Sequence, residues 1–319
     1  MIPKKDIIEI YKKHFPSRID KISDDFVDEF VKDIYKLGRP EDVVKIKNDA
    51  LFVEKTIIKH ILLLENEDIE PEYLSLYARK MNSSTIKADN PTVIFDELLQ
   101  YTLMSFYLMV FSLAYNNSKD NFERCFKNCV VLLDLQGNKK EIGTHNLKEV
   151  INMCRLPKEV IDLSTDAFWA SWTFIFAHEL YHAKCIDKIS PLQEELNADR
   201  FAYITLQHLI EAQSNAEIPD EIRVFHEYLY LAPMMLMEYF KLLDFYNSLF
   251  GKENNYTDYP SPELRQDKLF DMFDDYIPET LDTTIGNDLY NRLLDQIDVL
   301  REQLEIKKKE GKLDFLNNI

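Results

Sequence analysis

The chain has 319 residues, of which 46% are hydrophobic, and this is enough to bury a substantial core. Its formal net charge of −18 argues against DNA or RNA as the main partner, because phosphate binding needs clustered cations and the cationic run at 307–309 is short. Glycine is scarce, with 6 residues, and helices tolerate glycine poorly in their interiors. We therefore expect a mainly α protein.

The first part of the chain, residues 1–90, is expected to form an N-terminal helical region. Phe26 and Phe30 lie on one face of a predicted amphipathic helix, and residues 45–64 predict the next helix after a Gly-Arg-Pro turn. Residues 66–96 contain two polar stretches and predict loops around one short helix. A domain boundary is expected near residue 90.

Residues 98–115 form an uncharged apolar segment that is just long enough to cross a bilayer. Gln100, Thr102 and Ser105 are polar residues within it, and a polar Asn-Asn-Ser-Lys-Asp stretch follows it. These polar residues favour a core helix in a helical domain over a membrane span. We therefore expect no membrane partner.

Residues 129–143 predict the small β element of the fold. An aliphatic run rich in β-branched residues leads to a Gln-Gly-Asn sequence and a polar return, which is typical of a short hairpin. We interpret residues 91–280 as one core of the α+β class. Residues 281–319 are interpreted as a C-terminal amphipathic helix.

The C-terminal helix carries a narrow apolar seam at Leu293, Ile297, Leu300 and Leu304. The spacing is that of a coiled coil, but the seam lasts less than two heptads. Packing on the protein's own core is therefore favoured over a dimer zipper, and the sequence does not fix the oligomeric state.

Four cysteines occur, at positions 125, 129, 154 and 185, and the chain begins without the apolar stretch of a signal peptide. These features indicate a reducing, cytoplasmic setting. Cys125 and Cys129 are four residues apart, but a zinc site would need two further ligands at similar spacing. We interpret them as buried, reduced thiols.

The sequence His-Glu-Leu-Tyr-His, residues 178–182, carries the strongest chemical signal in the chain. Helical geometry places His178 and His182 on one face, one turn apart, so both imidazoles can reach one metal ion. Glu179 then lies where it can take a proton from a water that the metal has made acidic. The preceding residues 167–177 are almost entirely apolar, and polar groups at the end of a buried helix need a partner.

A third ligand is predicted on the following helix. Ser190 followed by proline, with Gln193 three residues after the serine, predicts a helix start. If two antiparallel helices meet at this turn, Glu195 faces His182 across the pair. Asp199, one turn further on, is placed to accept a hydrogen bond from the outer nitrogen of a ligating histidine.

Two other side chains are alternative ligands. Glu194 precedes the favoured Glu195, but its i+4 neighbour is an alanine, which leaves no acid to support a histidine. Cys185 shares the face of the two histidines if the first helix continues that far, and thiolate is a good zinc ligand.

These elements resemble the HExxH and ExxxD motifs of gluzincin metallopeptidases. The Ala-Asp-Arg-Phe-Ala sequence at 198–202 is close to that of the CaaX-protease/HtpX and ImmA/IrrE families, and residues 258–269 look like the HPxxxxR-type element of such proteins. Size and element order are most similar to the Lit phage-exclusion peptidases. The resemblance covers residues 165–270 and implies a zincin-like core with two metal-site helices.

Carried over by position, the resemblance implies Zn²⁺ bound by His178, His182 and Glu195. It also implies Glu179 as the general base, Asp199 as a support of the site, and hydrolysis of a peptide bond in a protein substrate, by resemblance a translation factor. Tyr259 stands where the family has histidine, and it is a candidate catalytic residue because a phenol can donate a hydrogen bond to an oxyanion. The alternative is a turn tyrosine that precedes Pro260.

Three further positions bear on this reading. Tyr181 replaces a glycine of the family beside the site. Arg265 could orient a nearby carboxylate, but we interpret it as a surface arginine. Residues 129–136 are the candidate edge strand for substrate, and a plain core strand is the alternative.

We therefore predict a cytoplasmic zinc endopeptidase, with low basal activity, that serves phage exclusion and antiviral defence. One alternative is a catalytically inactive helical sensor or scaffold in which zinc is structural and Glu194 or Cys185 is a fourth ligand. The other is an intramembrane protease of the HtpX type, inserted through residues 98–115.

Overall fold

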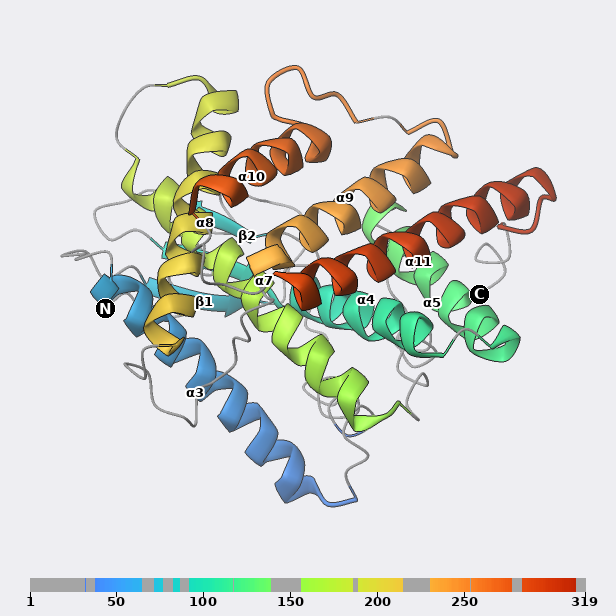
Figure 1. Ribbon diagram of the computed structural model, residues 1–319, viewed down its shortest axis with the longest axis horizontal. Coiled ribbons are helices and arrows are strands. Elements are labelled where there is room, and N and C mark those ends of the chain that lie inside the picture. Colours follow the sequence, from blue (N-terminus) through green and yellow to red (C-terminus); the bar gives the residue numbers. More distant parts are fainter. Residues whose placement is uncertain are drawn as a thin grey trace.

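A long buried helix, α7 (Lys158–Lys184), passes through the centre of the fold (Figure 1). Every residue from Ala167 to Leu180 is buried, as the apolar sequence predicts. The helix contacts α3, α4, α8 and α9 and the strands β2 and β3. Because it is covered on all sides, it fixes the position of whatever its C-terminal turns present.

The computed structural model describes residues 32, 38–64, 72–76, 83–86, 92–116, 118–138, 156–185, 189–214, 230–252, 254–276 and 283–313. Within these ranges the chain is mainly helical, as predicted. The other helices are α3 (Pro40–Leu64), α4 (Glu97–Tyr115), α5 (Lys119–Asn138), α8 (Pro191–Ser214), α9 (Ala232–Ser248), α10 (Pro262–Tyr276) and α11 (Thr284–Lys309). The expected helix that contains Phe26 and Phe30 lies outside the described residues.

A three-stranded sheet packs against α7. Its order is β1 (Glu72–Leu76), β3 (Thr92–Asp96) and β2 (Ser83–Ile86), with β1 parallel and β2 antiparallel to the central β3. Val93, Ile94 and Phe95 are all buried, and the Phe95 ring stacks on Trp172 of α7 with ring centroids 5.2 Å apart. This contact attaches the sheet to the central helix.

The three strands correct the prediction of loops and one short helix at 66–96 where this range is described, and the rest of the range lies outside the described residues. The described residues at the centre of β3, Val93 to Phe95, are buried in succession and show no alternating polar pattern, so periodicity does not reveal this strand. The boundary expected at residue 90 falls inside this sheet, because β1 and β2 precede it and β3 follows it.

The predicted hairpin at 129–143 is wrong over residues 129–138, which belong to α5, and residues 139–143 lie outside the described residues. Cys125, Cys129, Val130 and Leu133 are buried at the 4-1-3 spacing of one helical face. The aliphatic run therefore belongs to a buried helix rather than to a strand. Residues 129–136 consequently do not form an edge strand for substrate.

The apolar segment at 98–115 forms α4, which packs inside the protein as expected. Leu103, Tyr107 and Phe111 are buried, and the Tyr107 hydroxyl lies 2.6 Å from Ser171 Oγ of α7. Burial strongly raises the pKa of Tyr107. Among the described helices, none combines the length and the apolar character that crossing a membrane requires.

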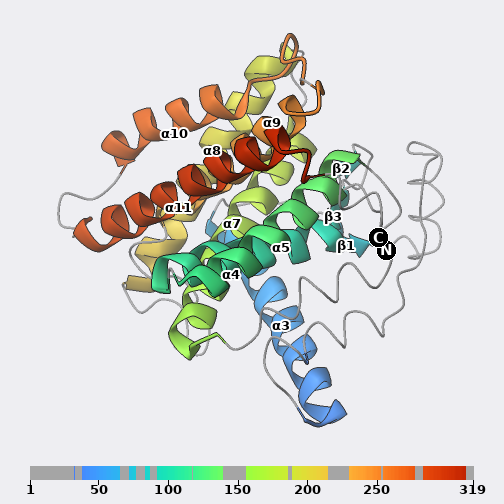
Figure 2. The same cartoon turned by 90° about the vertical axis from the view of Figure 1, so that its right-hand side faces the viewer.

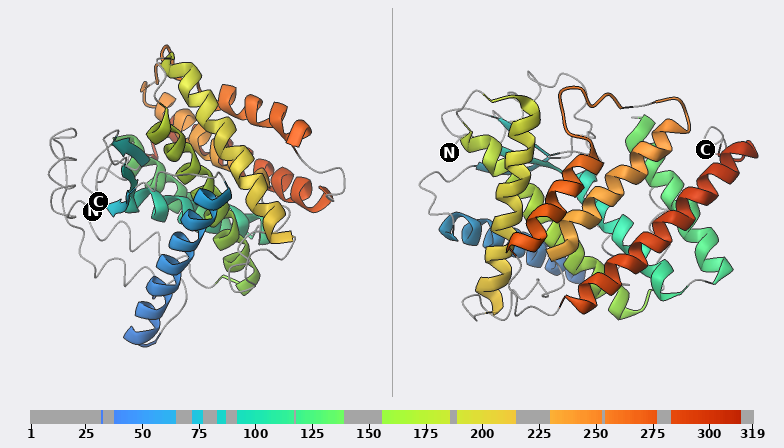
Figure 3. Two further views of the ribbon diagram at one scale, coloured as in Figure 1. Left: turned by 90° about the vertical axis from the view of Figure 1, so that its left-hand side faces the viewer. Right: turned by 45° about the horizontal axis from the view of Figure 1, so that its top comes forward.

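The four seam residues of α11 are 0% exposed, which confirms that this seam packs on the protein's own core. The helix contacts α4 and α9, and Figure 2 shows it running beside α4, which α5 also contacts. In Figure 3, α8, α10, α9 and α11 follow one another across one face, in agreement with their contacts. This order places α10 between the α7–α8 pair and the C-terminal helix.

Truncation of the α11 seam tests this packing. Leu300→Ala is expected to lower the free energy of unfolding by about 2–5 kcal/mol, because Leu300 is fully buried and its removal leaves a cavity. Val299→Ala is the matched control, since Val299 is 40% exposed and its loss should change stability by less than about 0.5 kcal/mol. Urea denaturation measures both, and equal effects would contradict the assigned face.

Candidate metal centre

The C-terminal turns of α7 and the first turns of α8 face each other beside their short connection. Gln193 donates its backbone N–H to Ser190 Oγ at 3.3 Å, which confirms the predicted helix start at this turn. His178 and His182 come from α7, and Glu195 comes from α8. The structure therefore brings together the three side chains that the sequence nominated as metal ligands.

The distances between the donor atoms fit a single ion. His178 Nε2 and His182 Nε2 are 3.0 Å apart, and the Glu195 carboxylate oxygens lie 3.3 Å from the first and 3.4 Å from the second. In a tetrahedral zinc site, metal–ligand bonds of about 2.0–2.2 Å place neighbouring ligand atoms roughly 3.3–3.6 Å apart. In the part of the chain that the structure describes, this is the group of histidine and carboxylate side chains that could hold a metal ion.

The outer nitrogen of each histidine contacts a carboxylate. His178 Nδ1 lies 2.9 Å from Asp199 Oδ1, and His182 Nδ1 lies 2.9 Å from Glu194 Oε1. A neutral imidazole that donates from Nδ1 leaves the Nε2 lone pair free for a metal. The Asp199 contact matches the prediction. Glu194, considered earlier as a rival ligand, instead supports the second histidine.

Arg265 on α10 forms a bidentate ion pair with Asp199. Its Nε and Nη2 atoms donate to the Asp199 oxygens at 2.7 and 2.6 Å. The Asp199 side chain is fully buried and that of Arg265 is 20% exposed, so the interpretation of a surface arginine is wrong. The less favoured interpretation, that Arg265 orients a nearby carboxylate, is the one the structure has, but no local pattern indicates that α10 returns to the face of α8 and supplies this pair.

Opposite charges around Asp199 and His178 set their protonation. Burial would raise the pKa of Asp199, but the neighbouring Arg265 and the hydrogen bonds from His178 and Arg265 outweigh it and lower the pKa to about 2. Burial would lower the pKa of His178, but its bonds to Asp199 and Glu195 outweigh that effect and raise the pKa to about 9. The carboxylates of the group therefore attract a cation. In the metal-free protein, a proton on His178 supplies part of the positive charge.

Glu179 lies next to this group and is anchored by the sheet. Its side chain is 7% exposed, and Thr85 of β2 donates to its Oε2 at 2.8 Å. The Thr85 hydroxyl is also 2.8 Å from the backbone carbonyl of Glu179. Thr85 is a residue of the site that the sequence analysis did not find, because it is 94 positions away and its strand was not predicted.

The remaining candidates lie outside the ligand group. Tyr259 is 55% exposed in the connection before α10, and no hydrogen bond among the described residues joins it to the histidines. Tyr181 packs beside the site, with its ring centroid 6.3 Å from that of His182 and 6.0 Å from that of Phe201. Cys185 caps the end of α7, where its backbone N–H donates to the Tyr181 carbonyl.

Removal of the charge on Asp199 tests the support of His178. Asp199→Asn should weaken metal binding about 10–100-fold, because the amide no longer fixes the imidazole as a carboxylate does and leaves Arg265 unpaired. Asp162→Asn on the exposed part of α7 is the matched control. Competition with a chromophoric chelator measures the affinity, and equal affinity in both variants would contradict the assigned role.

The pKa shifts predict opposite pH responses with and without metal. The raised pKa of His178 stabilises the metal-free fold fully below pH 6.5, and this contribution is lost as the pH rises through about 9. The lowered pKa of Asp199 stabilises it above pH 3.8, and this contribution is lost as the pH falls through about 2. Metal binding needs neutral His178, so the stabilisation by added Zn²⁺ should grow from pH 6.5 to 9.

Thermal unfolding in chelator and in Zn²⁺, measured between pH 5.5 and 9, checks this prediction. His178→Gln is the reference, because it removes the titrating imidazole while other groups still titrate. A metal-free difference between wild type and His178→Gln that does not change with pH would refute the assigned protonation.

Comparisons with known proteins add one partial similarity. No family model matches the chain, and no solved structure matches it. The chain is similar to the UvrABC system protein C of Borrelia turicatae (strain 91E135), with 24% identity over 170 residues. The aligned part is 49% of this chain and only 26% of that protein's length. A likeness of this extent assigns no family.

Proposed function

We propose that the protein is a zinc-dependent endopeptidase with a zincin-like core. The observation that carries the proposal is the group of His178, His182 and Glu195, whose donor atoms stand 3.0–3.4 Å apart at the end of a buried helix. Two imidazoles and one carboxylate form a donor set that suits zinc. Glu179, the neighbour of the first ligand, supplies the carboxylate that hydrolysis requires.

The side chains around the proposed zinc ion have separate roles in hydrolysis. A zinc ion held by the three ligands would polarise the scissile carbonyl and make water more acidic. Glu179 takes the proton from the attacking water and returns it to the leaving amine. Asp199 and Glu194 hold the two imidazoles in the orientation that presents Nε2. Thr85 fixes the Glu179 carboxylate, which limits its movement between these two steps.

The substrate is proposed to bind along β2. This strand is at one side of the sheet by strand order, and its Thr85 contacts the catalytic carboxylate. An extended peptide can add to such a strand by main-chain hydrogen bonds, which recognise backbone rather than sequence. A peptide placed there would bring its scissile bond close to Glu179.

The alternative of a structural zinc in an inactive scaffold requires a fourth protein ligand. Glu194 contacts the outer nitrogen of His182 and therefore does not face the ion. Cys185 is outside the group that the described residues form. Three protein ligands leave one position for water or substrate, which favours catalysis over a structural role.

The biological setting is proposed from the motif resemblance and the cysteine usage. The similarity to the Lit phage-exclusion peptidases extends the proposal to a cytoplasmic, regulated protease of antiviral defence that acts on a translation factor. Low basal activity is part of the proposal, because an unregulated cytosolic protease would damage its host.

Glu179→Gln separates catalysis from metal binding. The variant should retain one zinc per chain and lose activity about 10²–10⁴-fold, because the amide cannot accept the proton. Mapping of new protein termini in cells expressing either form measures cleavage, and elemental analysis measures zinc. Glu211→Gln, an exposed position on α8, is the matched control. Zinc-loaded Glu179→Gln that cleaves like wild type would refute the mechanism, and wild type without stoichiometric metal would refute the site.

A further inference from the structure

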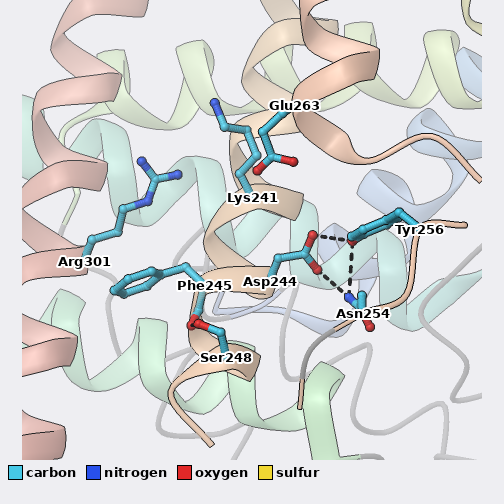
Figure 4. A pocket seen from close by; sticks show the side chains of 8 residues that line it. All are labelled: Lys241, Asp244, Phe245, Ser248, Asn254, Tyr256, Glu263 and Arg301. Carbon is cyan, nitrogen blue, oxygen red and sulfur yellow. Dashed lines mark hydrogen bonds between the residues drawn. The ribbon is translucent and has the colours of Figure 1, made fainter. Parts of the chain in front are cut away.

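A cavity that is open to solvent and lined mainly by charged and polar residues lies among α9, α10, α11 and the connection from α9 to α10 (Figure 4). Its volume is about 590 Å³, within the roughly 300–1,000 Å³ that is typical of small-molecule sites. None of the metal-site side chains lines it. The charged groups around it are of both signs, and they are arranged on two walls.

One wall is cationic. Lys241 on α9 donates to Glu238 Oε1 at 2.7 Å and to Gln266 Oε1 at 2.9 Å. Arg301 on α11 lies 3.4 Å from Glu238 Oε2 and 3.2 Å from Asp298, whose side chain is 74% exposed and therefore well screened by water. Two cations thus share one buried carboxylate, and the second anion beside them, Asp298, lies in solvent.

The other wall is anionic. Asp244 on α9 accepts hydrogen bonds from the Tyr256 hydroxyl and the Asn254 amide, which are both neutral donors. Glu263 on α10 lines the solvent-exposed rim of the same cavity. Among the described residues, neither carboxylate forms an ion pair with a cation of the chain. Burial raises the pKa of Asp244, and the negative charge of Glu263 adds to this effect.

The two walls do not neutralise each other. Lys241 and Asp244 are three residues apart on one helix, a spacing that allows an ion pair. Figure 4 shows instead that the Lys241 amine points away from Asp244, whose carboxylate is turned to Tyr256 and Asn254. Opposite charges held apart around a cavity remain available to a ligand that carries both.

We propose that this cavity binds a small zwitterion of the amino acid class. Its ammonium group would lie against Asp244 and Glu263, and its carboxylate would lie against Arg301 and the Lys241 side of the cavity. Phe245 also lines the cavity and offers apolar surface to the carbon chain that joins the two groups. A bare metal ion fits less well, because it needs about six or more oxygen ligands in a far smaller space.

The site is independent of the proposed peptidase activity, although α10 connects the two regions. Glu263 lines the cavity, and Arg265, two residues later, binds the Asp199 that supports the metal ligand. Gln266 belongs to the network around Lys241. A ligand in the cavity therefore contacts the helix that holds the metal-site arginine.

Calorimetric titration of the full-length protein with three matched probes tests the proposal. 6-Aminohexanoate carries both charges, hexylamine carries only the cation, and hexanoate carries only the anion. The zwitterion should bind at least about tenfold more tightly than either half, because each charged end adds a charge-assisted hydrogen bond. Absence of heat with all three at 10 mM, where the tenfold advantage would be visible, or equal binding of the zwitterion and one half, would overturn the proposal.

Variants on the two walls assign the site. Glu263→Gln and Arg301→Gln should each weaken binding of 6-aminohexanoate about tenfold, whereas Asp267→Asn, an exposed position on α10, should leave it unchanged. Arg301→Lys keeps the charge beside Glu238 and protects the fold, and its affinity should lie between those of Arg301→Gln and wild type. Unchanged affinity in correctly folded Glu263→Gln and Arg301→Lys would place the ligand elsewhere and refute the assignment.

Discussion

The site depends above all on one buried carboxylate, that of Asp199. It accepts from His178 on one side and from Arg265 on the other, so it joins α7, α8 and α10 at a single point. A buried carboxylate without partners would lower the folding stability by several kcal/mol. The packing of the three helices that supplies both partners of Asp199 is therefore strongly favoured. The orientation of the first metal ligand is consequently a property of the tertiary fold.

Part of this arrangement could be read from the sequence because it is governed by local helical geometry. The i, i+4 spacing of His178 and His182 fixes a shared face, and the cap at Ser190 fixes where α8 begins. Once those two facts are known, the length of the connection places Glu195 opposite the histidines and Asp199 one turn beyond. The same local pattern predicted the buried character of α7 and the seam of α11.

The errors occurred where tertiary context decides the structure. The run that begins at Cys129 reads as a strand because its residues are β-branched and aliphatic, but burial on most sides suits a core helix equally well. Thr85 lies on a short strand that exists only because β3 pairs with it. Arg265 reaches Asp199 across 66 positions, and no propensity or period encodes such a contact. A long-range ion pair is visible in sequence only through a motif resemblance, which here covered the arginine without indicating its partner.

The rule that a buried charge needs a partner also applies to the contrast between the two polar regions, the metal group and the cavity beside α11. At the metal group, Asp199 forms an ion pair with Arg265. The other carboxylates around the two imidazoles give the group a negative charge, which favours a cation. In the cavity beside α11, Lys241 and Arg301 share Glu238, while Asp244 is held by neutral donors only. α10 contributes a side chain to each region, Arg265 to the first and Glu263 to the second. Because folding alone gains little from charge near a protein interior, the charged groups of the two regions fit the ligands proposed for them, and one helix links the two places.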